Sequence, residues 1–460
     1  MPTMDFDAAV IGGGSAGFAA ARSLAAGGWK VALVDGASEL GGLCILRGCM
    51  PTKALLHAAE LRQSFRHAET WGMVAREVDV DVARLFDRKD ALIAEFAKYR
   101  QDQLQNGPFE LIRGRAHFTD PHTLEIHGHR TIRARHFVLA TGSVIAPPPN
   151  EGLRHAGYLN SDSALQLQRI PESLVVLGGG AVALEFAQFF SRMGSLVSIV
   201  QRSPNLLSGF DHDLADELET ALDREGLQVF TDTRLLDVRR RGHEKEVLFE
   251  EAGREVTIAA EEVFHGLGRR PATEHLGLDR AGVTVSPRGQ IQTDDFQRTT
   301  ASHIFAAGDC CGPHEVVHIA IQQAELAARN LLNPGLPVAI DHRMLTQVVF
   351  TDPGVAVTGL TEREAAERQI AVRVARYPFN DHGKSMILGC QEGYVKLLAA
   401  AGSGEILGGA CVGPQAGELI HEVTVAIAAR LTAAQFAAIP HYHPTLAEIW
   451  TYPAEELAAP

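Results

Sequence analysis

The sequence predicts an α/β protein in which two similar βαβ units precede a C-terminal domain of mixed α and β structure. Two glycine-rich runs, at residues 12–17 and 178–183, each follow an apolar segment of strand length and lead into a predicted helix. Residues 341–460 alternate strand-like and helix-like segments without such a run. A chain of 460 residues has room for about two to four domains, so this division fits its length.

The first βαβ unit is predicted from a buried strand at Phe6–Ile11, a helix at Ser15–Ala26 and a second strand at Lys30–Val34. The matching strand, helix and strand of the second unit are Leu174–Leu177, Ala181–Met193 and Leu196–Val200. The same unit therefore occurs twice, which indicates an internal repeat.

The first glycine-rich run fits the fingerprint of a dinucleotide-binding turn. Gly12 suits the tight turn, Gly14 the close approach of a pyrophosphate and Gly17 the packing of helix on strand. Ser15 opens the helix, whose N-terminus would face the pyrophosphate. Asp35 stands 23 residues after Gly12, where its carboxylate can accept hydrogen bonds from ribose hydroxyls. These features predict a Rossmann-like dinucleotide-binding domain.

The second run has the same pattern but a different ending. It contains Gly178 and Gly180, with Ala183 in the third position, where the fingerprint allows alanine. The residue 23 positions after Gly178 is Gln201 instead of a carboxylate, and Arg202 follows it. A guanidinium without a neighbouring negative charge favours a 2′-phosphate, so NADP(H) is favoured over NAD(H). An ordinary solvated arginine is the alternative for Arg202.

A pair of cysteines follows the first unit, in the segment from Gly41 to Lys53. Five residues of ideal helix would separate the Cα atoms of Cys44 and Cys49 by about 7.5 Å, beyond the roughly 4.4–6.8 Å of a disulfide. Gly48 can relax the turn between them, and Pro51 suits a first helical turn that places Cys49 at a positive helix end. The position beside a nucleotide site favours a redox-active disulfide over two unrelated buried thiols.

The remaining segments connect these units. Leu61–Gln105 is mostly helical and charged in pattern, and Phe109–Leu139 is predicted as several short strands. Glycine-containing strand ends at Ala140–Ser143 and Gly266–Pro271 indicate crossover points between domains. Pro147–Pro149 is typical of a linker.

Composition and charge narrow the class of protein. The formal charge of −14 means that the chain has no excess of basic residues to attract nucleic acid or acidic membranes. The apolar stretch Ala8–Ala26 is crowded with glycine and contains Arg22, which argues against a signal or a membrane span. Six cysteines without a secretory segment indicate a reducing compartment, so we expect a cytoplasmic protein.

With two unlike nucleotide sites, a dithiol between them and a third domain, the chain resembles the flavoprotein pyridine nucleotide-disulfide oxidoreductases. This is the group of dihydrolipoamide dehydrogenase, glutathione reductase and mercuric reductase. The resemblance runs almost end to end and includes Ile304–Asp309, which looks like the family's second FAD motif, and His443–Glu448. It implies FAD in the first site, with Asp309 directed at the ribityl chain, and NAD(P) in the second.

The resemblance also implies a domain order. Residues 1–148 would begin the FAD-binding domain, 149–270 would form the NAD(P)-binding domain, 271–338 would return to the FAD-binding domain, and 339–460 would form the interface domain of a homodimer. The residues expected to bind the cofactors are Gly12, Gly14, Ser15, Gly17, Asp35, Gly42, Lys53, Thr141, Gly142, Asp309, Gly178, Gly180, Ala183, Gln201, Arg202 and Gly268. No metal site is expected.

The resemblance assigns catalytic roles as well. Cys49 would be the flavin-facing thiol that forms a charge-transfer complex, and Cys44 the interchange thiol that attacks substrate. Lys53 matches the family lysine near the flavin ring, and Glu185 its carboxylate partner, which would stabilise charge that develops on reduction.

Near the C-terminus, His443 would be the acid-base catalyst, with Glu448 holding its ring and stabilising the imidazolium. Thiol-disulfide exchange runs through thiolates, so the chemistry needs such a base. In the family this histidine serves the dithiol of the other subunit. Neighbouring His441 has no comparable support.

Three features depart from the family pattern. Leu43 stands where threonine is common, and Ile45–Arg47 replaces an asparagine-containing segment, which makes the dithiol loop more apolar. Arg47 would either attract an anionic substrate or lower the pKa of the cysteines; the sequence leaves both open. Adjacent Cys310 and Cys311 are expected to be two packed thiols, with metal capture as the weaker alternative.

The expected function is transfer of an electron pair between NAD(P)H and a small or protein-bound disulfide or dithiol, most like dihydrolipoamide dehydrogenase. An NADPH-dependent reductase of another disulfide or of a metal ion, similar to mercuric reductase, is the first alternative. The chain has no cysteine after Cys411 and so lacks the C-terminal pair that delivers metal in mercuric reductases. A redox-sensing flavoprotein with incidental turnover is the alternative from another class.

Overall fold

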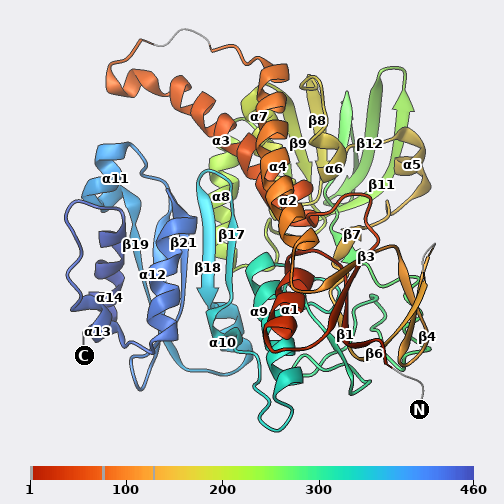
Figure 1. Cartoon of the computed structure of the whole chain (residues 1–460). Coiled ribbons are helices and arrows are strands. Elements are labelled where there is room, and N and C mark those ends of the chain that lie inside the picture. Colours follow the sequence, from red (N-terminus) through yellow and green to blue (C-terminus); the bar gives the residue numbers. More distant parts are fainter. Residues whose placement is uncertain (1–3, 75–77, 128–129, 460) are drawn as a thin grey trace. The chain divides into compact units, whose positions relative to one another are not determined.

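A computed structural model describes residues 4–74, 78–127 and 130–459. The chain divides into two compact units (Figure 1). The first consists of Met1–Pro51, Asp87–Pro147 and Gly268–Asp341, and the second of Thr52–Phe86, Pro148–Leu267 and His342–Pro460. Each unit contains one of the two βαβ repeats.

The first unit is built on a parallel sheet with the strand order β3-β2-β1-β6, and β16 pairs with the other side of β6. These strands are β1 (Phe6–Ile11), β2 (Val31–Asp35), β3 (Glu110–Arg113), β6 (Arg130–Leu139) and β16 (Ile304–Ala306). The antiparallel strands β4 (Ala116–Asp120) and β5 (Thr123–Ile126) extend the sheet. The central strand β1 is buried at nearly every position, as expected for a parallel strand that is covered on both faces.

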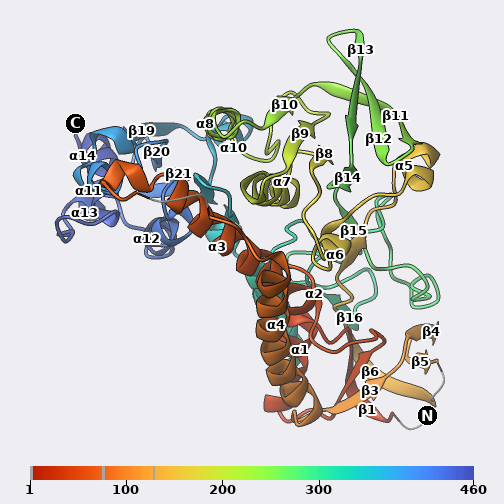
Figure 2. The same cartoon turned by 90° about the horizontal axis from the view of Figure 1, so that it is seen from above.

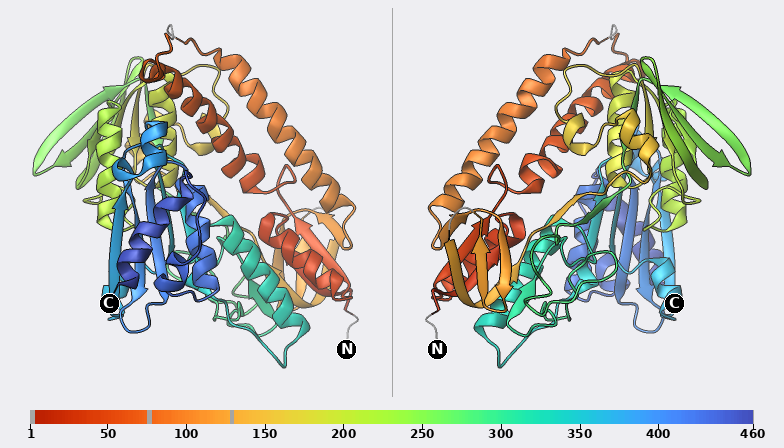
Figure 3. Two further views of the ribbon diagram at one scale, coloured as in Figure 1. Left: turned by 90° about the vertical axis from the view of Figure 1, so that its left-hand side faces the viewer. Right: turned by 90° about the vertical axis from the view of Figure 1, so that its right-hand side faces the viewer.

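The helices of this unit are α1 (Ser15–Ala26), α2 (Leu43–Leu46), α9 (Val317–Leu332) and most of α4 (Val82–Gln105). Helices α1 and α9 lie side by side (Figure 3). Their shared core contains mostly alanines, including Ala20, Ala21, Ala324 and Ala327. Small side chains let the two backbones approach closely, which explains the small-residue composition of the first helix.

Two short strands lie at the predicted crossover points. β7 (Ser143–Ile145) pairs antiparallel with β15 (Arg269–Pro271), and Ala146 N donates to Gly268 O at 3.1 Å. The two predicted crossover segments, one after each βαβ unit, are therefore hydrogen-bonded to each other within the first unit.

The second unit takes α3 (Cys49–Arg66) from Thr52 onward, together with η1 (Ala68–Trp71). It contains a second parallel sheet in the order β10-β9-β8-β14. The strands are β8 (Ser173–Leu177), β9 (Leu196–Val200), β10 (Gln228–Phe230) and β14 (Glu262–His265), and the helices are α5 (Glu151–Ala156), α6 (Ser161–Ala164), α7 (Ala181–Met193) and α8 (His212–Arg224). A separate antiparallel sheet contains β11 (Thr233–Arg241), β12 (Glu244–Glu251) and β13 (Arg254–Ala260) (Figure 2).

The C-terminal part of this unit has an antiparallel sheet in the order β17-β18-β21-β20-β19. Its strands are β17 (Thr346–Val349), β18 (Gly354–Gly359), β19 (Val372–Pro378), β20 (Tyr394–Ala400) and β21 (Ile406–Gly413). Its helices are α10 (Glu362–Glu367), α11 (Gly383–Leu388), α12 (Ala416–Ala428), α13 (Ala433–Ala437) and α14 (Thr451–Ala458), with short 3₁₀ turns η2 (His342–Met344), η3 (Phe379–Asp381) and η4 (Ala447–Trp450). Trp450 is fully buried in this core, and its indole nitrogen donates to Leu419 O at 3.0 Å.

The predicted fold class is confirmed, with two Rossmann-like units and a C-terminal α+β part. The bounds of β1, α1, α7 and β9 are as the sequence predicts, and β2 begins one residue later than predicted. The three predicted boundaries between these domain segments stay a prediction. None of the helices in the described ranges is both long and apolar enough to cross a membrane.

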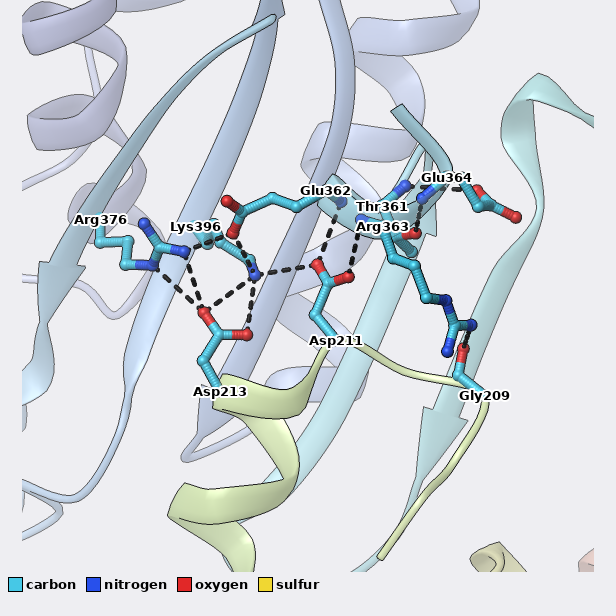
Figure 4. Close-up of polar contacts among 9 residues, drawn as sticks. All are labelled: Gly209, Asp211, Asp213, Thr361, Glu362, Arg363, Glu364, Arg376 and Lys396. Carbon is cyan, nitrogen blue, oxygen red and sulfur yellow. Dashed lines mark hydrogen bonds and ion pairs between the residues drawn. The ribbon is translucent and has the colours of Figure 1, made fainter. Parts of the chain in front are cut away.

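An ion network joins α8, α10 and the C-terminal sheet within the second unit (Figure 4). The fully buried ammonium of Lys396 lies 3.0 Å from Asp211, 2.9 Å from Asp213 and 2.8 Å from Glu362. Burial alone would lower the pKa of Lys396, but the carboxylates of Glu362, Asp211 and Asp213 raise it above its ordinary value. Arg376 adds a second positive charge against Asp213.

The carboxylate of Asp211 also accepts hydrogen bonds from the backbone nitrogens of Glu362 and Arg363, at the start of α10. The three acidic side chains are close enough together to hold a cation. Lys396 already supplies the positive charge among them, so we interpret the cluster as a structural ion network.

We predict that Lys396→Met lowers the free energy of unfolding by about 3–5 kcal/mol, because it removes the counter-charge of the buried Asp211 and leaves Asp213 and Glu362 with Arg376 alone. Urea unfolding followed by fluorescence measures this change. The control is Arg224→Gln, which removes an exposed ion pair with Glu392 and should cost less than about 1 kcal/mol. Equal small losses in both variants would contradict the interpretation.

Candidate active site

The first glycine turn leaves no space for a side chain at Gly12 or Gly17. Gly12 has a φ of +107°, and a Cβ there would lie 2.3 Å from Ala140 O. A Cβ on Gly17 would lie 1.7 Å from Gly12 O, so α1 packs directly against the turn. Glycine is therefore required at both positions. A dinucleotide-binding turn uses the same close packing of helix, turn and strand.

The predicted ribose carboxylate is held firmly beside this turn. Asp35 is buried, and its Oδ2 accepts a hydrogen bond from Gly13 N at 2.6 Å. Its Oδ1 accepts from Ala37 N at 2.8 Å and from the guanidinium of Arg113 at 3.1 Å. Oδ2 retains acceptor capacity for a ligand. Sequence reasoning missed Arg113, because it comes from β3, far along the chain.

The residues of this unit fit a bound dinucleotide. A Cβ on Gly42 would lie 2.7 Å from the Cα of Gly14, so the two bare backbones form a narrow cradle at the start of α1. Ser15 begins that helix, as predicted. Thr141 and Gly142 lie half-buried between β6 and β7, within the same unit.

The predicted FAD carboxylate, Asp309, is part of a short chain of polar contacts. Its Oδ2 accepts a hydrogen bond from the Ser143 hydroxyl at 2.6 Å. The same hydroxyl accepts from Arg269 Nε at 2.8 Å, and the Arg269 guanidinium also donates to Ser143 O at 2.9 Å. Ser143 and Arg269 were absent from the predicted site, although both lie in the glycine-containing strand ends that the sequence shows.

The two cysteines lie at the junction of two helices. Cys44 is in α2, and Cys49 is the first residue of α3, with Arg47 and Gly48 between the helices. Both cysteines are partly exposed. The N-terminus of an 18-residue helix carries partial positive charge, which favours a negative sulfur at Cys49. The partial exposure of both thiols and the position of Cys49 at a helix N-terminus are suited to thiol-disulfide exchange.

Lys53 and Glu185 lie in contact within the second unit. The ammonium of Lys53 is 2.8 Å and 3.0 Å from the two carboxylate oxygens of Glu185, whose side chain is buried. Phe350 N also donates to Glu185 at 3.1 Å, and the Lys53 ammonium lies 4.4 Å from the centroid of the Phe350 ring. Sequence reasoning missed Phe350, because no motif surrounds it.

The second glycine turn repeats the first. Gly178 has a φ of +110°, and a Cβ there would lie 2.5 Å from Gly266 O, while Gly180 faces open space. A Cβ on Gly266 would lie 2.8 Å from the Cβ of Ala183, which explains the small residue at that position. The predicted nucleotide contact Gly268 belongs to the first unit.

The two residues that bear on nucleotide choice differ in exposure. Gln201 is buried, and its side chain donates to Asn205 O at 3.3 Å. Arg202 is exposed just after β9 and has no ion-pair partner in the part of the chain that the structure describes. Its guanidinium is therefore available to a ligand.

The C-terminal histidine is paired with the carboxylate that the resemblance implied. His443 Nδ1 lies 2.9 Å and 3.0 Å from the two carboxylate oxygens of Glu448, and the His443 side chain is 75% exposed. Its Nε2 has no hydrogen-bond partner among the described residues, which leaves it available for proton transfer. His441 also has a carboxylate partner: Nε2 lies 2.5 Å from Glu422, and Nδ1 lies 2.9 Å from Ile439 O. Because both ring nitrogens of His441 are engaged and the ring is buried, its role is structural.

Cys310 and Cys311 are two buried thiols, as predicted, and they do not form a disulfide with each other. Cys310 donates to the carbonyls of Leu139 and Ala307 at 3.4 Å, and Cys311 donates to Gly308 O at 3.3 Å. Hydrogen bonding to Cys310 and burial raise the pKa of Cys311 well above its ordinary value. The pair packs the segment next to Asp309.

A family model described as pyridine nucleotide-disulphide oxidoreductase matches residues 6–324, and the dimerisation domain of that family matches residues 345–454. The chain therefore belongs to this family of FAD-dependent enzymes that act on disulfides with NAD(P), and the predicted resemblance is confirmed.

Two relatives show its place in the family. It is 37% identical to dihydrolipoyl dehydrogenase from Thermus scotoductus, over 98% of this chain and 97% of that protein. It is 32% identical to a mercuric reductase from Staphylococcus aureus, over 93% of this chain and 78% of that protein.

Among solved structures, a Cu(II) complex of the HOCl-induced flavoprotein disulfide reductase RclA from Escherichia coli is similar, with a TM-score of 0.87 and 26% identity. The similarity covers 99% of this chain and 100% of that one.

Proposed function

We propose that this protein is a homodimeric FAD enzyme that passes an electron pair between NADPH and a disulfide or dithiol through Cys44 and Cys49. The observation that carries the proposal is the placement of the two cysteines at the α2–α3 junction, with Cys49 opening a long helix. The sequence identity to a dihydrolipoyl dehydrogenase supports a small or protein-bound substrate of the dihydrolipoamide type.

FAD, when bound, relays electrons between the nicotinamide and the dithiol. In the proposal, the glycine turn at 12–17 binds the pyrophosphate, Asp35 the adenosine ribose and Asp309 the ribityl chain. Lys53, oriented by the buried Glu185 at 2.8 Å, stabilises the negative charge that develops beside it on reduction.

The reduced dithiol then acts on substrate. The Cys44 thiolate attacks one sulfur of the substrate disulfide, the S–S bond breaks, and the first substrate thiolate leaves. Cys49 attacks the Cys44 sulfur, which releases the second substrate thiol and restores the Cys44–Cys49 disulfide. The substrate gains two hydrogens in all, and the dithiol is oxidised.

His443 moves the protons of this exchange. Its Nδ1 is held by Glu448 at 2.9 Å, so its exposed Nε2 can protonate a leaving thiolate and deprotonate an entering thiol. The match of residues 345–454 to a dimerisation domain supports a homodimer, in which the partner subunit's His443 serves the dithiol of this chain.

NADPH is the proposed nucleotide. Arg202 is exposed and without an ion-pair partner among the described residues, and Gln201 places no negative charge beside it. A guanidinium in this position binds a 2′-phosphate. The cytoplasm is the proposed compartment, because the six cysteines include a dithiol that must cycle in a reducing environment.

Reduction of a metal ion is the second candidate. It is favoured by the sequence identity to a mercuric reductase and by the similarity to a flavoprotein disulfide reductase whose structure was solved as a Cu(II) complex. The His443–Glu448 pair favours an organic disulfide.

A substrate panel tests the proposal. We expect NADPH-dependent reduction of lipoamide above that of glutathione disulfide, quinones, Hg(II) or Cu(II), with Cys44→Ser lowering disulfide turnover by about a thousandfold or more. Cys390→Ser, at an exposed cysteine outside the dithiol, should leave turnover unchanged. Disulfide turnover that survives in Cys44→Ser would refute the proposal, and faster turnover of a metal ion would favour the second candidate.

His443→Gln separates the two half-reactions. Because the proton step belongs to thiol exchange, disulfide turnover should fall by about 10²–10⁴-fold. Flavin reduction by NADPH in stopped flow should stay within about twofold of wild type, because that half-reaction does not need the histidine base. The control is His441→Gln, which removes a structural histidine. Equal slowing of both half-reactions in His443→Gln would contradict the assigned role.

Arg202→Ala tests nucleotide choice. Loss of charge-assisted hydrogen bonds should raise the Kd of NADPH by about 10–100-fold and leave the Kd of NADH unchanged. Isothermal titration with both nucleotides measures this, with Arg234→Ala as an exposed arginine control in the same unit. If both nucleotides lose affinity equally, Arg202 does not bind the 2′-phosphate.

A further inference from the structure

The segment that follows β17 is held against one face of α7 within the second unit. Glu185, Gln188 and Arg192 are spaced three and four residues apart on that helix, and all three side chains are buried. Gln188 makes two hydrogen bonds with Asp352: Nε2 donates to Asp352 O at 2.7 Å, and Oε1 accepts from Asp352 N at 2.8 Å. Arg192 donates to the Asp352 carboxylate at 2.9 Å. The position of the segment relative to α7 is therefore fixed.

Phe350 is the residue of this segment that contacts the Lys53–Glu185 ion pair. Its backbone nitrogen donates to Glu185 Oε1 at 3.1 Å, and the Lys53 ammonium lies 4.4 Å from the centroid of its ring. The ring edge lies near the bare backbone of Gly417 in α12, where a Cβ would be 3.9 Å from Phe350 Cε1. The ammonium of Lys53 thus has two partners, one carboxylate and one aromatic ring.

The two partners act differently on the charge of Lys53. The carboxylate of Glu185 carries a full negative charge and forms the ion pair at 2.8 Å. The face of the Phe350 ring attracts a cation through its quadrupole but carries no net charge. The ring therefore strengthens the hold on the ammonium without cancelling more of its charge. A second carboxylate in place of the ring would also hold the ammonium, but it would leave the group with a net negative charge.

Lys396, in the same unit, shows the contrast. Its ammonium contacts three carboxylates, and its side chain is fully buried. Among the described residues, Lys53 contacts one carboxylate, and a third of its side chain is exposed. Phe350 is also about half exposed, at 47%. The charge of Lys53 is therefore balanced once, and its side chain remains accessible to a further negative group.

We propose that Phe350 is a positioning residue whose ring holds the Lys53 ammonium beside Glu185 and keeps its charge available to the flavin as the flavin gains electrons. The inference rests on the proposed function in taking Lys53 as the lysine that faces the flavin. An ammonium held in one position does not have to reorganise when negative charge develops next to it, which makes its stabilisation of that charge effective. Loss of the ring should therefore make the bound flavin harder to reduce.

The reduction potential of the bound flavin tests this inference without turnover. The variants are Phe350→Leu, Phe350→Tyr, Lys53→Met and the double variant Phe350→Leu/Lys53→Met. All are made together with Cys44→Ser and Cys49→Ser, so that the flavin is the only redox group of the proposed relay. Equilibration with a reference dye measures each potential. The matched control is Phe65→Leu, which replaces a phenylalanine of similar exposure, 53%, on α3.

We expect Phe350→Leu to lower the ratio of reduced to oxidised flavin at a fixed potential by about fivefold, which is about 20 mV for a two-electron couple. Phe350→Tyr keeps the aromatic face and should match wild type, as should Phe65→Leu. In the Lys53→Met background, Phe350→Leu should have no effect, because the ring acts through the ammonium. An unchanged potential in Phe350→Leu, or an equal shift in the Lys53→Met background, would overturn the inference.

A second measurement separates this inference from the proposed function. Acetylation of the native protein with N-hydroxysuccinimidyl acetate, followed by mass spectrometry, gives the rate at Lys53 relative to the exposed Lys98. The relative rate should rise about threefold in Phe350→Leu and stay at the wild-type value in Phe350→Tyr, because an ammonium without the ring leaves Glu185 more often. An unchanged rate in Phe350→Leu would overturn the inference. A raised rate together with an unchanged potential in Lys53→Met would count against the proposed role of Lys53 at the flavin and not against its placement by Phe350.

Discussion

The close backbone contact between Gly12 and Gly17 is the constraint on which the first nucleotide site depends. Because a Cβ on Gly17 would come within 1.7 Å of Gly12 O, the strand, turn and helix can pack only if both residues are glycine. This packing directs the start of α1 toward the bare backbone of Gly42 and places Gly13 N against Asp35. In the second turn, Gly178 meets Gly266 O much as Gly12 meets Ala140 O, whereas Ala183 stands in the place of Gly17.

The same packing also determines where the dithiol lies. The segment that follows β2 passes Gly42 beside Gly14 and continues at once into α2, where Cys44 lies. A helix end then presents Cys49. The nucleotide cradle and the thiols are therefore linked by a few residues of backbone in one compact unit, which is the arrangement that an electron relay requires.

Buried charge serves two different purposes in the second unit. Lys396 is enclosed by carboxylates from three sides, which makes a structural connection between α8, α10 and the C-terminal sheet. Lys53 has one carboxylate partner, and a third of its side chain is exposed. A lysine that is compensated on one side and open on the other can respond to charge that appears next to it, whereas Lys396 cannot.

Much of the fold could be predicted from the sequence, because buried parallel strands and glycine turns leave local patterns. The bounds of β1, α1 and α7 follow from apolar runs and glycine positions alone. The supporting polar residues could not be predicted in this way. Arg113, Ser143 and Arg269 reach their partners from elements that are distant in sequence. Phe350 likewise lies outside any motif, so only the folded chain shows what it contacts.

If the flavin and the Cys44–Cys49 disulfide form one redox unit, the oxidised, FAD-loaded protein should take up electrons at both groups. An anaerobic titration with dithionite counts the electrons taken up per bound flavin. We expect about four electrons for wild type, two for the flavin and two for the disulfide, and about two for Cys44→Ser or Cys49→Ser. An uptake of about two electrons by the wild-type protein would contradict this expectation.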